Sequence, residues 1–351
     1  MLDKKIPIGI LGATGMVGQR FIQLLEGHPW FEIVWLAASE HSEGKSYAEA
    51  VRWRMKSVLP ERIAKLQMSP ADPANAPKVI FAALDSGPAQ ELEPLFADAG
   101  CAVVTNSSAF RMYPDVPLVI PEVNPEHIAV LELQKWRKKS GGFIVTNPNC
   151  CAIGLVMALA PLHQRFYIDK LFVSTMQAVS GAGYPGVPSL DILGNVIPFI
   201  NGEEPKLEAE TKKLLGTHGP GGITDAPFAI TAHCNRVAVE DGHTECVSLS
   251  FARKATEGAI LDAWGGYIGV PQQLGLPSAP PQLLIYDDRP DRPQPRFDVD
   301  AGGGMTATLG RLRPCGLLDW KFVVLSHNTI RGAAGAAILN AELLKAKGYI
   351  G

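Results

Sequence analysis

Short apolar runs alternate with amphipathic stretches over the first 150 residues of this 351-residue chain. Amphipathic segments near 16–27 and 89–99 have the period of helices, because their apolar residues recur on one face. The apolar runs are typical of buried strands, and they cover residues 6–11, 31–37, 79–83, 102–105 and 143–145. Strands that alternate with helices favour a parallel sheet with right-handed crossovers. The pattern therefore predicts an α/β, Rossmann-type doubly wound sheet.

The pattern changes after residue 150. The apolar stretch Ala152 to Leu162 is too long for a strand and predicts a buried helix. Longer strands with few helices between them predict an α+β domain with a mixed, largely antiparallel sheet and helices on one face. These strands are expected at 171–179, 228–239, 244–251, 306–312 and 321–326, with helices near 206–215 and 257–266. The many prolines between 275 and 295 indicate a loop or an arm over another surface.

An alanine-rich stretch that ends near Lys347 predicts a last helix that docks on the first domain. The first domain is then discontinuous. We expect it to comprise residues 1–149 and 330–351 and to bind the nucleotide. Residues 150–329 are expected to form the catalytic and dimerisation domain.

A glycine-rich turn separates the first strand from the first helix. Its spacing is G-x-x-G-x-x-G, from Gly12 to Gly18. Such a turn lets the backbone approach a pyrophosphate and aims a helix N-terminus at it, although the same glycines also occur in plain turns. Contacts to a dinucleotide are expected from Gly12, Thr14, Gly15, Met16 and Val17.

The polar stretch after the second strand is expected to contact the adenosine ribose. Ser39, Ser42 and Lys45 are suited to a 2′-phosphate, which favours NADP. Glu40 is suited instead to a ribose hydroxyl, so NAD stays as an alternative cofactor, and a solvated loop is the third interpretation. NADP is the prediction.

Cys150 begins the long apolar helix directly after a strand and an Asn147-Pro-Asn149 turn. Free backbone N–H groups and the positive end of the helix dipole favour a thiolate there, and a thiolate is a nucleophile. The alternative is one more buried small residue. Cys151 is expected in the core, and a structural role is predicted for Cys101, Cys234, Cys246 and Cys315.

Composition excludes several classes of protein. A net charge of −3 without a basic stretch argues against a nucleic-acid partner. The sequence shows neither an apolar run of membrane-spanning length nor a signal segment, so we expect a soluble, cytoplasmic protein. The six cysteines have no C-x-x-C spacing, which favours reduced thiols, and no metal site is predicted.

Two charged residues of the second domain stand out. Arg236 lies inside an apolar strand, where a buried guanidinium needs an anionic partner. That partner is either a structural carboxylate or the carboxylate of a substrate. His243 lies in a turn between strands, where a surface residue is the plain alternative to a functional one.

Together these residues resemble the aspartate-β-semialdehyde dehydrogenase family, in its archaeal and fungal branch, over nearly the whole chain. The motifs are Gly12-Ala-Thr-Gly15, Asn147-Pro-Asn-Cys150, Gln177, Ser180-Gly-Ala-Gly183, Glu203 with Lys206, Cys234-Asn-Arg236, Asp241-Gly-His243 and Asn328-Thr-Ile-Arg-Gly332. Many members have Arg where this chain has His41, which leaves the choice between NADP and NAD open.

The resemblance implies reversible reduction of β-aspartyl phosphate to aspartate semialdehyde with NADPH, in the biosynthesis of lysine, threonine, methionine and isoleucine. It implies Cys150 as the nucleophile that forms a thioacyl enzyme, His243 as the general acid and base, and Gln177 as the residue that orients the thioester. The other roles also come from the resemblance. Substrate contacts are implied for Arg236, Glu203, Arg111, Lys206 and Asn149, and further cofactor contacts for Ser180, Gly181, Gly183 and Asn328.

In these assignments Arg236 and Glu203 bind the α-carboxylate and the α-ammonium of the substrate, and Arg111 and Lys206 bind its phosphate. The expected partners are small molecules and a second copy of the chain, in a homodimer or homotetramer. Archaeal malonyl-CoA reductase is the nearest rival, but its cysteine follows a leucine where this chain has Asn149, whose amide can bind a phosphate. A non-catalytic nucleotide-binding protein on the same fold is the other alternative.

Overall fold

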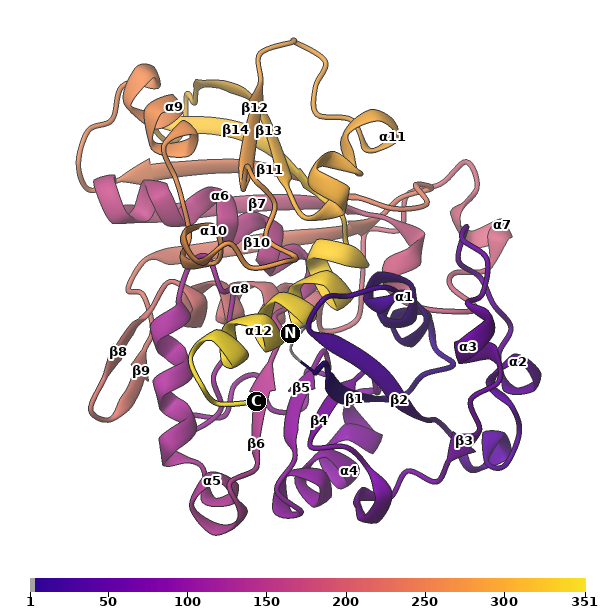
Figure 1. Ribbon diagram of the computed structural model, residues 1–351. Helices are drawn as coiled ribbons and strands as arrows, with labels where there is room; N and C mark the ends of the chain where they lie inside the picture. Colours follow the sequence, from indigo (N-terminus) through magenta and orange to yellow (C-terminus); the bar gives the residue numbers. More distant parts are fainter. Residues whose placement is uncertain (1–3) are drawn as a thin grey trace.

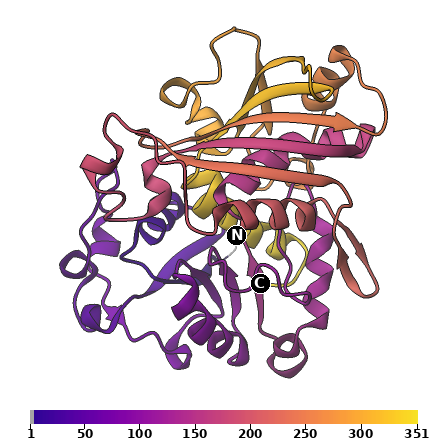
Figure 2. The same ribbon diagram turned by 180° about the vertical axis from the view of Figure 1, so that it is seen from behind.

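The computed structural model describes residues 4–351, which form two sheets, one above the other in both views (Figures 1 and 2). The first sheet is parallel, and its strand order is β3-β2-β1-β4-β5-β6. The strands are β1 (Ile6–Leu11), β2 (Phe31–Ala37), β3 (Met68–Ser69), β4 (Val79–Ala82), β5 (Ala102–Thr105) and β6 (Phe143–Thr146). The predicted Rossmann-type sheet is confirmed.

Helices cover both faces of this sheet over its central strands, which explains why those strands are largely apolar. Ile8 and Ile10 of β1 pack with Phe21 of α1 (Met16–Leu25) on one face. Leu11, one residue further, packs with Phe96 of α4 (Ser86–Asp98) on the other face. Short helices complete this half of the molecule: α2 (Tyr47–Ala50), α3 (Glu61–Ala64) and α5 (Lys135–Ser140), with the 3-10 segment Pro125–Leu133.

The second sheet is mixed, with the order β10-β7-β11-β14-β13-β12. Its two outer pairs are parallel and the pairs between them are antiparallel, as the predicted α+β architecture requires. The strands are β7 (Ile168–Gln177), β10 (Ala229–Arg236), β11 (His243–Phe251), β12 (Leu284–Asp287), β13 (Ala307–Pro314) and β14 (Trp320–Ser326). Its main helices are α6 (Cys150–Phe166), α8 (Glu203–Leu214) and α9 (Glu257–Gly265).

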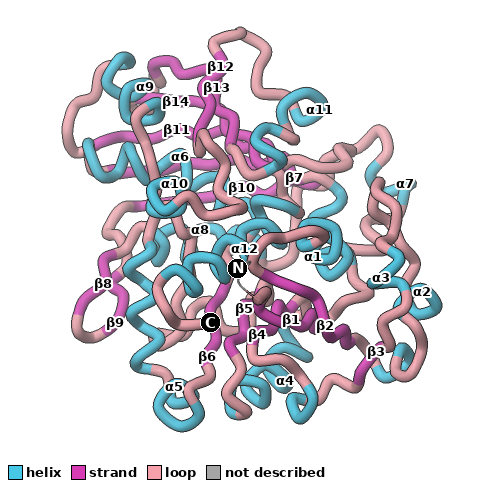
Figure 3. Tube along the Cα trace, viewed as in Figure 1, coloured by secondary structure: helices cyan, strands magenta, loops and turns pink. Residues whose placement is uncertain are grey.

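Several elements carry no clear sequence signal. The proline-rich segment is not all loop, because β12 pairs in parallel with β13 inside it. Figure 3 shows β8 (Thr217–Gly219) and β9 (Gly222–Thr224) as a separate small hairpin. The remaining short helices are α7 (Ser189–Ile192), α10 (Val270–Leu274) and α11 (Pro295–Asp298).

The C-terminal segment returns to the first sheet. A π-helical turn, Ile330–Ala334, leads into α12 (Gly335–Ala346), drawn in yellow beside α1 in Figure 1. Ala337, Leu339 and Leu343 belong to the same buried cluster as β1 and α1. Residues far apart in the sequence thus build one core. No helix within residues 4–351 has the length and apolarity needed to cross a bilayer.

Candidate active site

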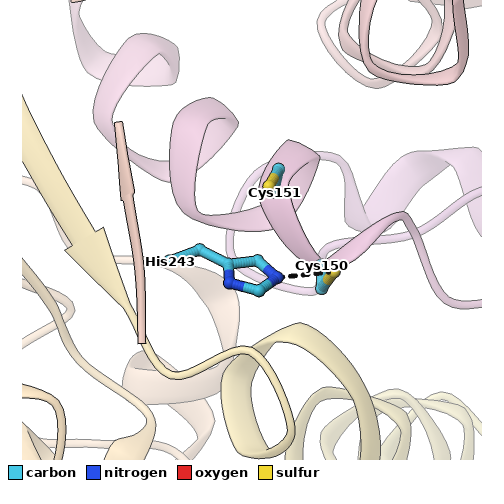
Figure 4. A group of neighbouring side chains, drawn as sticks. All are labelled: Cys150, Cys151 and His243. Atoms are coloured by element: carbon cyan, nitrogen blue, oxygen red, sulfur yellow. Dashed lines mark hydrogen bonds between the residues drawn. The ribbon is translucent and has the colours of Figure 1, made fainter. Parts of the chain in front are cut away.

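Cys150 begins α6 at the boundary between the two sheets, as the sequence predicts. Asn149 is the N-cap of this helix, and its side-chain oxygen accepts hydrogen bonds from the N–H groups of Cys151 (2.8 Å) and Ala152 (3.2 Å). The cap fixes the first helical turn and therefore the direction of the Cys150 side chain. Its sulfur lies 3.2 Å from Nε2 of His243 (Figure 4).

The tautomer of His243 follows from its second contact. Nδ1 accepts a hydrogen bond of 3.1 Å from the backbone N–H of Ala178, so Nδ1 carries no proton. The proton of the neutral ring is then on Nε2, where it faces the Cys150 sulfur. The imidazole is fully buried behind the sulfur, which is itself half-buried. This pair is a nucleophile beside a proton donor, the arrangement that covalent catalysis requires.

Neighbouring groups favour the thiolate of Cys150. The adjacent Cys151 thiol, followed by His243 and Arg111, holds the pKa of the Cys150 thiol well below its usual value, against the burial that raises it. Burial raises the pKa of Cys151 itself well above the usual value, so Cys151 stays a thiol. Of the two adjacent cysteines, only Cys150 is prepared to act as a nucleophile.

The sulfurs of Cys150 and Cys151 and a ring nitrogen of His243 lie within 4.8 Å of one another, which is also the composition of a zinc site. Histidines that bind zinc normally donate their other ring N–H to an acceptor. Here the other nitrogen accepts from the Ala178 N–H, so the ring is held in the wrong tautomer for a metal at Nε2. The contact between the Ala178 N–H and His243 therefore favours a proton donor at Nε2 over a metal ligand.

Glu203, the first residue of α8, carries a buried negative charge beside the nucleophile. Its Oε1 accepts hydrogen bonds from Nδ2 of Asn149 (2.8 Å) and Nε2 of Gln177 (3.2 Å). No cationic side chain of residues 4–351 lies within 4.0 Å of this carboxylate. The site therefore holds an acidic group without a cationic partner. Asn149, expected to contact a phosphate, is engaged by the helix cap and by Glu203.

Arg236, at the end of β10, is the complementary case. It is only 6% exposed, and its Nη1 donates to the carbonyl of Ala178 at 2.8 Å. In the described part of the chain no carboxylate lies within 4.0 Å of its guanidinium. The structural carboxylate that the sequence left open as a partner is therefore not there, and most of the guanidinium donors remain free for a bound anion.

Arg111 and Lys206 line the same cavity, but they differ in burial and in their contacts. Lys206 is exposed on α8. Arg111 is buried, and its Nη1 forms an ion pair of 3.0 Å with Glu210, while Nη2 donates to the carbonyl of Asn106 at 2.6 Å. Glu210 was not among the residues predicted from the sequence. Its signal is the spacing from Glu203 and Lys206, because positions i, i+3 and i+7 share one face of a helix.

Two neighbouring cavities form a continuous groove. One, of about 570 Å³, contains the Cys150 sulfur. It is also lined by the predicted residues Gln177, Arg111, Asn149, Glu203, Lys206, Arg236, Ser180, Gly181, Gly183 and Asn328. The other, of about 740 Å³, is lined by Gly12, Thr14, Gly15, Met16, Val17 and Ser39. Met16, Val17 and Gly183 border both, so a long ligand at the glycine turn would reach the thiol.

Two of the predicted ribose contacts lie elsewhere. Ser42 is buried and Lys45 is exposed, and neither lines the groove, whereas Arg52 and Arg54 do. The buried side chain of Gln19 holds them there. It donates to the carbonyl of Arg52 (3.2 Å) and accepts from the N–H of Arg54 (2.8 Å). The sequence could not supply this, because the two arginines follow the ribose loop by several residues and a short helix.

Two glycines bring backbone against the reacting groups. A Cβ on Gly181 would lie 2.9 Å from Nη1 of Arg236 and 3.1 Å from Nε2 of His243, and a Cβ on Gly332 would lie 2.7 Å from the Cβ of Cys150. Any side chain at either position would displace a functional group. Asn328 ties the same loops together, because its Nδ2 donates to the hydroxyl of Ser180 at 2.8 Å.

Comparison with known proteins gives consistent matches over both halves of the chain. Residues 7–131 match the family model described as semialdehyde dehydrogenase, NAD binding domain, and residues 159–331 match semialdehyde dehydrogenase, dimerisation domain. Aspartate-semialdehyde dehydrogenase of Archaeoglobus fulgidus is 51% identical over 96% of this chain and 97% of its own length. The Saccharomyces cerevisiae enzyme is 45% identical over the full length of both chains.

Solved structures agree with these relatives. The crystal structure of aspartate semialdehyde dehydrogenase with NADP from Candida albicans superposes with a TM-score of 0.91, at 46% identity, over 98% of this chain and all of that one. Aspartate semialdehyde dehydrogenase II of Vibrio cholerae, complexed with ASA, gives a TM-score of 0.78 at 26% identity, over 99% of this chain and all of that one. The similarity covers both sheets and the groove between them.

Proposed function

Since this chain belongs to the aspartate-semialdehyde dehydrogenase family, we propose that it catalyses the reversible, NADPH-dependent conversion of β-aspartyl phosphate to aspartate semialdehyde and phosphate. The observation that carries this proposal is the Cys150–His243 pair in a groove that continues to the glycine turn. The enzyme is then an oxidoreductase of aspartate-family amino-acid biosynthesis.

The residues of the glycine turn fit a dinucleotide. Gly15 is the N-cap of α1 and has no side chain to accept from the helix, so the first N–H groups are left for a pyrophosphate. When bound, NADPH supplies a hydride to the acyl carbon. We assign the 2′-phosphate to Ser39 and Arg52, in place of Ser42 and Lys45. The nicotinamide end is assigned to Ser180, Gly181, Gly183 and Asn328, which lie on the Cys150 side of the groove.

The substrate is held by complementary charges. We assign its α-carboxylate to Arg236 and its α-ammonium to Glu203, because neither of these buried groups forms an ion pair within residues 4–351. Arg111 and Lys206 are assigned to the phosphate. With both ends of the substrate fixed, its β-carbonyl carbon would be directed at the Cys150 sulfur, and we assign the orientation of the acyl group to Gln177, which lines the same cavity.

The chemical steps follow from the sulfur and the imidazole. The Cys150 thiolate attacks the β-carbonyl carbon, a C–S bond forms, and the C–O bond to phosphate breaks, which leaves a thioester. Nε2 of His243 would then give its proton to the carbonyl oxygen when the acyl group is reduced. His243 then takes that proton back, the C–S bond breaks, and the aldehyde leaves as the thiolate is restored. In the opposite direction the same groups oxidise the aldehyde.

The charge at Glu203 separates this activity from malonyl-CoA reduction. A malonyl group has a carboxylate for Arg236 but no ammonium, so it would leave the Glu203 carboxylate buried without a cation. A buried charge without a partner is costly. The acidic residue therefore favours an α-amino acid derivative as the substrate.

A direct test compares two substrates, aspartate semialdehyde and malonyl-CoA, with the same cofactor. Wild-type protein should reduce NADP when given aspartate semialdehyde and phosphate, and should not oxidise NADPH with malonyl-CoA. Cys150→Ala should lose the reaction and still bind NADP, whereas Cys246→Ala, which removes an exposed cysteine, should keep full activity. Full activity of Cys150→Ala, or a preference for malonyl-CoA, would overturn the proposal.

The dimerisation-domain match indicates an oligomer, and we propose a homodimer or homotetramer in the cytoplasm. The six free cysteines suit a reducing compartment. We also propose that residues 1–149 with 330–351 form the cofactor domain and that 150–329 form the catalytic and dimerisation domain. The docking of α12 on the first sheet supports this division.

A further inference from the structure

Helix α8 presents a row of charged residues toward the phosphate side of the groove. Glu203, Lys206, Glu210 and Lys213 are spaced by three, four and three residues, which puts them on one helical face. The proposed function uses the first two as substrate contacts. The last two are buried, although glutamate and lysine are rarely buried without a specific role.

Glu210 joins Arg111 to the turn that precedes the nucleophile. Its Oε1 pairs with Nη1 of Arg111 at 3.0 Å, and its Oε2 accepts from the backbone N–H of Asn149 at 2.6 Å. The carboxylate is 1% exposed, so it is held entirely by these two contacts rather than by water. One side chain therefore fixes the guanidinium in relation to Cys150.

Lys213 holds the same arginine by its main chain. Its Nζ donates to the carbonyl oxygens of Arg111 (2.7 Å), Tyr113 (2.8 Å) and Val116 (3.0 Å). An ammonium group has three donors, and all three are used on this one loop. The loop that carries Arg111 has no regular strand or helix of its own, so Lys213 supplies the order that secondary structure does not.

We propose that Glu210 and Lys213 are positioning residues that hold Arg111 in place for the phosphate of the substrate, one through its side chain and the other through its backbone. The proposal rests on the proposed function, in which Arg111 binds phosphate. An arginine side chain loses rotamer entropy when it is fixed. With this ordering complete before binding, phosphate affinity increases without any further contact.

The test uses aspartate semialdehyde as the substrate, because formation of the thioester can then be measured separately from its cleavage by phosphate. Formation of the thioester and NADPH needs no phosphate and appears as a burst, while release of the acyl group to phosphate needs Arg111. Glu210→Gln and Lys213→Met should retain the burst and raise the KM for phosphate at least about tenfold, which corresponds to about 1.4 kcal/mol. Glu208→Gln and Lys212→Met, changes of the same kind on the same helix, should leave both unchanged.

A double-mutant comparison with Arg111→Ala isolates the positioning role. Once Arg111 is removed, Glu210→Gln should raise the phosphate KM no further, because the group that it positions is gone. Should Glu210→Gln not fold, Glu210→Asp withdraws the carboxylate from Arg111 with its charge intact and gives the same readout. A normal phosphate KM in the folded variants overturns the inference, as does an equal loss of burst and phosphorolysis, which indicates a purely structural role. Absence of a burst in the wild-type enzyme overturns the proposed function instead.

Discussion

Replacement of Arg236 by leucine separates a substrate-binding charge from a structural one. The guanidinium has five N–H donors, of which one bonds to the Ala178 carbonyl, and no protein carboxylate of residues 4–351 pairs with it. Loss of a buried, hydrogen-bonded charge partner costs about 2–5 kcal/mol of binding, so Arg236→Leu should raise the KM for aspartate semialdehyde about 30-fold to about 4,000-fold. Steady-state kinetics at saturating phosphate and NADP measure the change.

The free energy of unfolding should respond differently from the KM. Among the residues that the structure describes, this buried charge has no ion-pair partner, so its removal relieves a desolvation cost and should leave the stability equal or greater. If Arg236 instead formed a structural ion pair, removal of its guanidinium would lower the free energy of unfolding by about 3–5 kcal/mol. Arg236→Lys keeps the charge without the planar fork and should give an intermediate KM. An unchanged KM with a large drop in stability on urea unfolding of Arg236→Leu would refute the reasoning.

Three further predictions concern the Cys150 thiol, Arg52, and a buried ion pair in which Nη1 and Nη2 of Arg331 donate to the Glu122 carboxylate at 2.8 and 2.6 Å. Because the pKa of Cys150 is lowered, the rate of its alkylation by iodoacetamide should be nearly constant between about pH 7 and about pH 9, where an ordinary thiol deprotonates. A rate that rises steadily through this range contradicts the prediction. Arg52→Ala should raise the KM for NADPH at least about tenfold and leave that for NADH unchanged, whereas Lys45→Ala should alter neither. Glu122→Ala should lower the free energy of unfolding by about 3–5 kcal/mol in urea melts, because it strands the fully buried Arg331; a smaller loss than Arg331→Met gives would count against this.

The sequence predicted the two sheets well because their signals are local. The central strands of the first sheet are covered on both faces and appear as apolar runs, and the glycine turn falls between β1 and α1. β12 was not predicted, because prolines surround it and its pairing with β13 depends on residues more than twenty positions away. A strand that is defined by its partner leaves little trace in its own residues.

The candidate site shows the same division between local and distant information. The position of Cys150 at a helix start could be inferred from the residues around it. Ser39, Ser42 and Lys45 were assigned to the ribose because they share one polar stretch, but only Ser39 lines the groove, together with Arg52 from a later segment. The Ala178 N–H that sets the tautomer of His243 is a backbone group, so no side-chain pattern could have indicated it.

The return of α12 to the first sheet has a consequence for how the protein is made. Ala337, Leu339 and Leu343 fill the core around β1 and α1, yet they follow the whole second sheet in the chain. Domains usually fold in order of synthesis, from the N-terminus. Here the residues of the first sheet emerge from the ribosome tunnel without α12, so part of their apolar surface stays uncovered. This lasts while nearly two hundred further residues are translated, about 10–40 s at cellular elongation rates. Premature termination between β14 and α12 would thus release a chain whose second sheet is complete and whose first sheet lacks part of its core.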